Sequence, residues 1–129
     1  MAIPEGRIFK FDPEDMIQSD FLEAFPYVGE KQVIEYKTKE FSAVCPFSGL
    51  PDFAELIIEY IPDQTCVELK ALKYYLISYR NIGIYQEAAT NRIFQDLYPV
   101  LAPRYLKITT IYNTRGGIDS TCYIERGEK

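Results

Sequence analysis

The stretch Phe53–Arg80, FAELIIEYIPDQTCVELKALKYYLISYR, changes its hydrophobic period halfway along. Its first nine residues, FAELIIEYI, are mostly apolar and stop at the turn signal PDQ, which predicts a strand. In VELKALKYYLISYR the apolar residues recur at helical spacing instead: Leu69, Leu72, Leu76 and Tyr79. This second pattern predicts a helix, which the sequence NIG breaks at Gly83.

The flanking segments extend this pattern in both directions. A strand is expected before the stretch, and a helix and two strands after it, over residues 31–44, 84–101, 104–112 and 118–125. Pro103 stops the second helix, and the glycines of NTRGG (113–117) allow a tight turn between the last two strands. The order strand, strand, helix, helix, strand, strand predicts an α+β fold, with a four-stranded antiparallel sheet and two helices on one face.

The length of 129 residues predicts one domain, spanning 1–129. Residues 1–29 carry three of the eight prolines and are expected to form a loosely structured arm. A small sheet with two helices leaves much apolar and aromatic surface uncovered, so a homo-oligomer is expected.

Composition excludes several classes of protein. A net charge of −5 argues against a nucleic-acid partner, and no run has the length of a membrane span. Three widely spaced cysteines and the lack of a signal-peptide pattern predict a reduced, cytoplasmic protein. The absence of histidine removes Ser-His and Cys-His nucleophile pairs and HExxH zinc sites, so no metal site is expected.

The segment AVCPFSGLPD places Cys45 at the start of a Pro/Gly loop and Asp52 seven residues later. Without histidine, a carboxylate must serve as the base or proton relay for a reactive thiol, and Asp52 is the nearest candidate. Such a pair suits addition to a polarised carbon such as a nitrile. The alternative is a buried structural cysteine beside a turn-forming aspartate.

Three other groups of residues are candidates for binding. Lys70 and Lys73 lie three apart on one helix face and are spaced to serve one anion, unless they form a solvated face. Arg115 precedes two glycines whose amides can approach a phosphate, unless the segment is a plain hairpin turn. Glu87 lies in the first turn of the second helix, where it also complements the helix dipole.

Together these segments resemble the short, single-domain NADPH-dependent nitrile reductases of queuosine biosynthesis, over roughly residues 22–119. The most specific parts are the cysteine-to-aspartate loop and ELKALKYY. Those enzymes reduce 7-cyano-7-deazaguanine to the 7-aminomethyl compound. Their family has the tunnelling fold and assembles into rings, commonly two stacked pentamers with active sites at the interfaces.

The resemblance implies a role for each matching residue. Cys45 matches the nucleophile that forms a covalent thioimide, and Asp52 matches the acid that protonates the nitrile nitrogen before two hydrides arrive from NADPH. Glu87 matches the carboxylate that accepts hydrogen bonds from the base. The remaining matches are the substrate-binding residues Val67, Glu68 and Leu69 and the cofactor-binding residues Lys70, Lys73, Arg115 and Gly116. Gln86, next to Glu87, is expected to bind substrate as well.

Two positions depart from the family pattern: Gln86 stands where histidine is usual, and Thr114 where proline is usual. A glutamine amide forms hydrogen bonds but does not transfer a proton as histidine does. Two alternatives stay open. One is a related amidinotransferase that adds ammonia to the nitrile on tRNA, which would make nucleic acid a partner; the other is a purine- or pterin-binding relative without turnover. The zinc cyclohydrolases of this fold are excluded by the lack of histidine.

Overall fold

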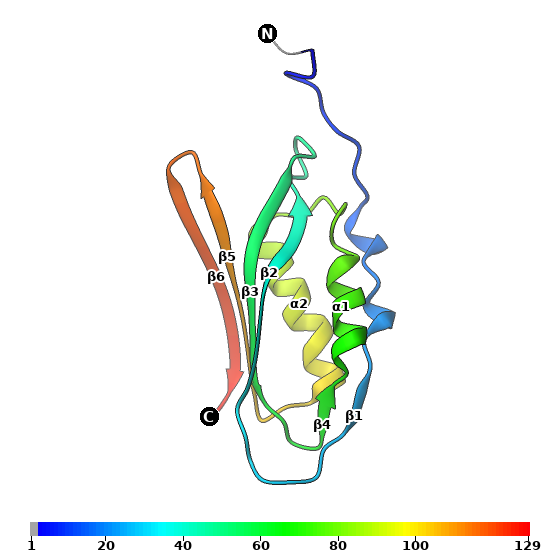
Figure 1. Ribbon diagram of the computed structural model, residues 1–129, viewed down its shortest axis with the longest axis vertical. Coiled ribbons are helices and arrows are strands. Elements are labelled where there is room, and N and C mark those ends of the chain that lie inside the picture. Colours follow the sequence, from blue (N-terminus) through cyan, green and yellow to red (C-terminus); the bar gives the residue numbers. More distant parts are fainter. Residues whose placement is uncertain (1–2) are drawn as a thin grey trace.

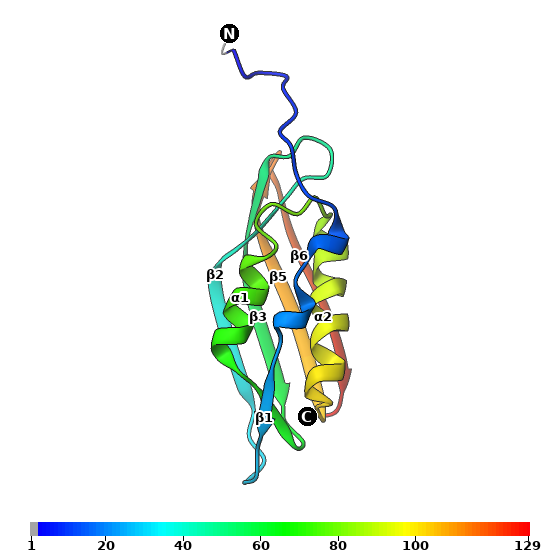
Figure 2. The same ribbon diagram turned by 90° about the vertical axis from the view of Figure 1, so that its right-hand side faces the viewer.

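The computed structural model describes residues 3–129 as one sheet covered by two helices (Figure 1). The antiparallel sheet has the order β2-β3-β5-β6, with β2 and β6 as its outer strands. Its strands span β2 Ile34–Val44, β3 Pro51–Ile61, β5 Tyr105–Arg115 and β6 Ile118–Gly127. The helices α1 (Leu69–Ile77) and α2 (Gln86–Leu101) lie side by side on one face (Figure 2). The predicted α+β class and element order are confirmed.

The core forms between the sheet and the helices because alternate residues of β3 face α1 and α2. Ala54, Leu56, Ile58 and Tyr60 are all buried, whereas the residues between them are partly or fully exposed. The stripe of α2 that includes Ile93 and Leu97 is fully buried as well. This alternation is the period-two pattern that separates the two faces of a strand.

The helix ends differ by a few residues from the expected ones, for local reasons. The Glu68 side chain accepts hydrogen bonds from the amides of Lys70 (2.9 Å) and Ala71 (3.0 Å), so Glu68 is the N-cap and α1 begins at Leu69. By contrast, α2 ends at Leu101 as expected, because Ala102 adopts a left-handed conformation with φ of 43° just before Pro103.

The N-terminal segment is more ordered than its composition suggests. It contains the short 3-10 helices η1 (Glu14–Met16) and η2 (Ser19–Phe21), followed by strand β1 (Ala24–Pro26). Strand β1 pairs with β4 (Thr65–Val67) in a separate two-stranded sheet. Burial of Ile17 and Leu22 anchors this segment against the helices, a long-range effect that a proline count does not reveal.

Three connections meet at one end of the molecule. They are the β2–β3 loop (45–50), the α1–α2 connection (78–85) and the β5–β6 turn at Gly116 and Gly117, and the N-terminal arm passes over the same end (Figures 1 and 2). Arg115 pairs with Ile118, so the tight turn expected within NTRGG is a two-residue hairpin loop, and its two glycines have the positive φ, 59° and 77°, that such a loop requires. The parallel pairing of Val44 with Gly83 joins the first two connections.

Candidate functional site

Cys45 is the first residue after β2, and a tight loop returns the chain to β3. Its amide donates a hydrogen bond to the Leu50 carbonyl (2.8 Å), and its carbonyl accepts one from the Gly49 amide (2.8 Å). The Phe47 amide points at the Cys45 Sγ from 3.4 Å. The thiol is half-buried, so it is neither sealed in the core nor fully solvated. The structural alternative of a buried cysteine therefore fails for Cys45.

This loop favours the thiolate form of Cys45. The backbone N–H groups of Ser48 and Phe47 lower the pKa of the Cys45 thiol, partial burial opposes them, and the Ser48 hydroxyl and the Arg115 charge lower it further. Hydrogen bonds to the charged form of a group favour that form. A thiolate is the nucleophilic form of cysteine, so the loop raises the fraction of Cys45 that can attack an electrophile.

Asp52 lies at the start of β3, opposite Ala43 of β2, and is buried on the face that the helices cover. Its Oδ1 makes an ion pair with the Arg115 guanidinium, which reaches over from the last residue of β5. The Asp52 side chain is 9% exposed and the Arg115 side chain 46% exposed, so the pair opens toward solvent on the arginine side. Arg115 thus contacts Asp52 and also acts on the Cys45 thiol.

The start of α2 contributes Gln86 and Glu87 to the same end. Gln86 is half-buried, and its carbonyl accepts a hydrogen bond from the Thr90 hydroxyl at 2.9 Å. Glu87 is exposed in the first turn. Burial and, to a smaller extent, the charges of Cys122 and Glu87 raise the pKa of Tyr112, so Glu87 lies near β5. Six of the expected site residues therefore lie at this end: Cys45, Asp52, Gln86, Glu87, Arg115 and Gly116.

Residues Val67, Glu68 and Leu69 lie elsewhere, between β4 and the start of α1, at the opposite end of the molecule from the Cys45 loop (Figure 1). Val67 is buried, and its amide donates a hydrogen bond to the Tyr60 hydroxyl (3.2 Å). Glu68 caps α1, while Leu69 is 55% exposed. Within a single chain, Val67, Glu68 and Leu69 therefore do not lie near Cys45.

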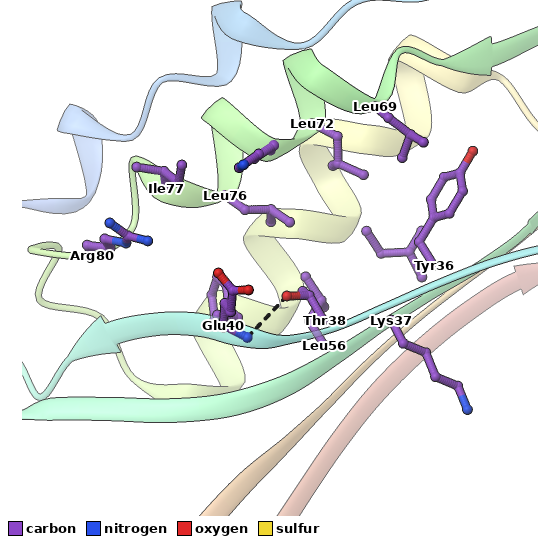
Figure 3. Close-up of a pocket in the computed structure, with 13 residues that line it drawn as sticks. Tyr36, Lys37, Thr38, Glu40, Leu56, Leu69, Leu72, Leu76, Ile77 and Arg80 are labelled. Atoms are coloured by element: carbon purple, nitrogen blue, oxygen red, sulfur yellow. Dashed lines mark hydrogen bonds between the residues drawn. The ribbon is translucent and has the colours of Figure 1, made fainter.

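Lys70 and Lys73 line different hollows on either side of α1. Lys73 borders a cavity of about 270 Å³ between α1 and β2, with Leu56, Leu72 and Leu76 in its wall and Arg80 at one end (Figure 3). Lys70 borders a hollow of about 430 Å³ that also contains three carboxylates, from Asp20, Glu23 and Glu68. Within one chain, the two lysines do not face a common anion site.

Sequence reasoning missed two features of the site. The first is the pair of amides at Phe47 and Ser48 that face the thiol; the cysteine followed by a Pro/Gly loop is the only local signal for them. The second is the ion pair between Asp52 and Arg115, which are 63 positions apart in the sequence and meet through sheet topology. No sequence motif predicts the contact between Asp52 and Arg115.

Across residues 3–129, no three Cys, Asp, Glu or His side chains converge in a way that would hold a metal ion. Within the same range, no helix is long and apolar enough to cross a membrane. The arrangement at the Cys45 end is that of a protein with a half-buried thiol faced by backbone amides, and at the same end lies a buried carboxylate, Asp52, that is paired with Arg115.

Comparisons with known proteins identify the family. A family model described as QueF-like protein matches residues 51–129, which include Asp52 but not Cys45. The chain is 57% identical over 122 residues to a protein of Thermotoga maritima named NADPH-dependent 7-cyano-7-deazaguanine reductase, covering 94% of this chain and 89% of that protein. It is 54% identical over 127 residues to a protein of the same name from Caldicellulosiruptor bescii, covering 97% and 96%. The chain belongs to the QueF family.

A solved structure shares the fold. The apo form of the archaeosine synthase QueF-Like superposes with a TM-score of 0.71 at 25% sequence identity, covering 78% of this chain and 99% of that one. The four-stranded antiparallel sheet with its helices is therefore the architecture of QueF-like proteins.

Proposed function

We propose that this chain reduces the nitrile of 7-cyano-7-deazaguanine to the 7-aminomethyl compound with NADPH, as a step of queuosine biosynthesis. The observation that carries the proposal is the half-buried Cys45 thiol with the Phe47 amide aimed at its sulfur. The names of the close relatives support the same reaction. Because that reaction uses NADPH and the three cysteines are free thiols, we place the enzyme in the cytoplasm.

The first step is addition of Cys45 to the nitrile. The sulfur forms a bond to the nitrile carbon, one π bond of the nitrile breaks, and the nitrogen takes up a proton, giving a thioimide. Asp52 delivers that proton. Asp52, which is paired with Arg115, accepts that proton from the Cys45 thiol as the sulfur–carbon bond forms and passes it to the nitrogen. The addition step therefore neither consumes nor releases a proton overall.

NADPH supplies the hydrides, at about two per nitrile, and each hydride is matched by a proton from solvent or from the site. We propose that Lys70, Lys73, Arg115 and Gly116 hold its phosphates, with contributions from neighbouring copies, because the two lysines of one chain line different hollows. The cavity beside Lys73 suits such a ligand because it combines apolar walls with cationic side chains at its border. In the reaction, Cys45 leaves the carbon as thiolate, which its loop amides stabilise.

For substrate recognition, we propose that Glu87 accepts hydrogen bonds from the N–H groups of the deazaguanine, with Gln86 beside it. A carboxylate left without those donors would be costly in a closed site, so bases lacking them are rejected. Val67, Glu68 and Leu69 are proposed to line the same base. Since they lie at the far end of the chain from Cys45, they must come from a second copy.

The proposed assembly follows from this division of the site. Subunits of the tunnelling fold join into a ring, and two stacked pentamers are the expected form, with each active site formed between neighbours. The uncovered outer strands β2 and β6 are compatible with such joining. A deazapurine nitrile, NADPH and further copies of this chain are then the partners.

A second function is favoured by one observation, the fold shared with the archaeosine synthase QueF-Like. That chemistry would add ammonia to a nitrile on tRNA and would use no NADPH. The lysine-containing helix sequence ELKALK and the net charge of −5 favour the reductase instead.

The test is to mix protein, 7-cyano-7-deazaguanine and NADPH and to follow cofactor absorbance together with intact protein mass. We expect nitrile-dependent oxidation of about two NADPH per nitrile, and a covalent adduct before NADPH is added. Cys45→Ala should abolish both, whereas Cys122→Ala, which removes a half-buried thiol on β6, should abolish neither. Ammonia-dependent amidine formation on tRNA without NADPH oxidation would transfer the assignment to the amidinotransferase.

A further inference from the structure

The N-terminal arm contacts the Cys45 loop directly. The Phe9 amide donates a hydrogen bond to the Ser48 carbonyl at 3.0 Å. Three residues later, the Asp12 amide donates to the Asn81 carbonyl (2.8 Å), and the Asp12 carbonyl accepts from the Gly83 amide (2.9 Å). Residues 9–12 therefore bridge the β2–β3 loop and the α1–α2 connection.

Two glycines let the arm approach closely. A Cβ at Gly49 would lie 2.3 Å from the Phe9 carbonyl oxygen, and one at Gly83 would lie 2.2 Å from the Phe11 ring. Real Cβ atoms do not tolerate either distance. The Phe11 ring thus packs directly against Gly83, and the Phe9 backbone packs directly against Gly49.

Both contact points are adjacent to the nucleophile. Ser48 and Gly49 belong to the loop whose amides face the Cys45 sulfur, and the Gly49 amide bonds the Cys45 carbonyl. Gly83 pairs with Val44, the residue that precedes Cys45. The arm consequently holds the β2–β3 loop at Ser48 and Gly49, and it also holds the end of β2 at Val44 through Gly83.

We propose that Phe9 and Phe11 are positioning residues, which hold the β2–β3 loop so that its Phe47 and Ser48 amides stay aimed at the Cys45 sulfur. The proposal rests on the proposed function only in taking Cys45 as the nucleophile. Neither residue touches the reacting atoms in the described structure; both act through the backbone of the loop. Release of the arm would let the loop turn its amides toward water and weaken their bonds to the thiolate.

Charged groups near the thiol do not account for this role. Arg115 of the β5–β6 hairpin lowers the pKa of the Cys45 thiol, but less than the loop amides do. The other charged side chains of the elements packed here include Asp52 of β3, which pairs with Arg115, Asp119 of the hairpin, Arg80 of the α1–α2 connection, Glu87 of α2, and Arg7, Lys10 and Asp12 of the arm. Substitutions at Phe9 and Phe11 leave all these charges in place.

The test measures iodoacetamide alkylation of the full-length protein against pH, with Cys45 and Cys122 quantified separately as peptides by mass spectrometry. Phe9→Pro removes the amide that bonds Ser48, and Phe11→Ala removes the ring that covers Gly83. Phe11→Tyr keeps the ring and serves as the conservative variant. Ile8→Ala is the matched control in the arm, because the Ile8 side chain is 70% exposed and directly precedes Phe9.

We expect the alkylation midpoint of Cys45 to rise by about one pH unit in Phe9→Pro and Phe11→Ala, since a hydrogen bond to a charged group is weakened. It should stay at the wild-type value in Phe11→Tyr and Ile8→Ala, and Cys122 should react alike in all the proteins. The proposal is judged on the Cys45 midpoint of the variant, Phe9→Pro or Phe11→Ala, whose circular dichroism spectrum matches that of the wild type. An unchanged Cys45 midpoint there, or an equal change at Cys122, overturns the proposal. Alkylation needs neither nitrile nor NADPH, so this outcome is independent of the reductase assay.

Discussion

The ion pair between Asp52 and Arg115 should contribute about 1–2 kcal/mol to the free energy of unfolding near neutral pH. Two unit charges in contact interact by about 4 kcal/mol at an effective dielectric constant of 20 and by about 1 kcal/mol in water. Asp52 is nearly buried, but the Arg115 side chain is 46% exposed, so solvent screening places the pair in the lower half of that range.

A double-mutant cycle with Asp52→Asn and Arg115→Gln measures this value by urea unfolding of the four proteins. Arg115→Gln should be the more damaging single change, because it leaves a buried carboxylate without its counter-charge. The control cycle is Glu35→Gln with Lys37→Gln, an ion pair on β2 whose side chains are 48% and 58% exposed. Its coupling should be below about 0.5 kcal/mol. A coupling for Asp52 and Arg115 no larger than the control value would refute the argument.

Two further predictions concern the reaction. Gln86→His restores a proton donor beside Glu87 and should raise the rate of NADPH oxidation, by up to about a hundredfold if that donor limits the reaction; an unchanged rate in stopped-flow assays would show that Asp52 or water already suffices. If the site spans two copies, Cys45→Ala and Leu69→Glu should each be inactive, yet a mixture refolded together should regain activity, because some interfaces then combine an intact Cys45 end with an intact Leu69 end. A mixture as inactive as its components would place the whole site within one chain.

The fold was predictable because its signals are local. The alternation in FAELIIEYI and the helical spacing of the leucines after Glu68 are each set by neighbouring residues, and the structure confirms both elements. Strands β1 and β4 were missed because each has three residues and depends on pairing with a distant segment. The order of the N-terminal segment was missed for the same reason, since Ile17 and Leu22 are buried against helices much later in the chain.

The candidate site was predictable in composition but not in arrangement. The CPFSGLPD loop points to Cys45 and Asp52 because proline and glycine mark a turn beside a thiol. That Arg115 would reach Asp52 depends on β5 lying next to β3, which is a property of the whole sheet. The spacing of Lys70 and Lys73 placed both on α1, yet their neighbours β2 and η2 separate the two side chains into different hollows.

The sheet ends in β2 and β6, strands of 11 and 10 residues with no partner on their outer sides within residues 3–129. Such open edges are templates for uncontrolled strand addition. Two features of β2 counter this hazard: the irregularity between Thr38 and Phe41, and the charged side chains at Glu35, Lys37, Lys39 and Glu40. A chain whose β2 edge is uncovered thus carries its own protection against aggregation, and that protection comes from residues far from the Cys45 loop.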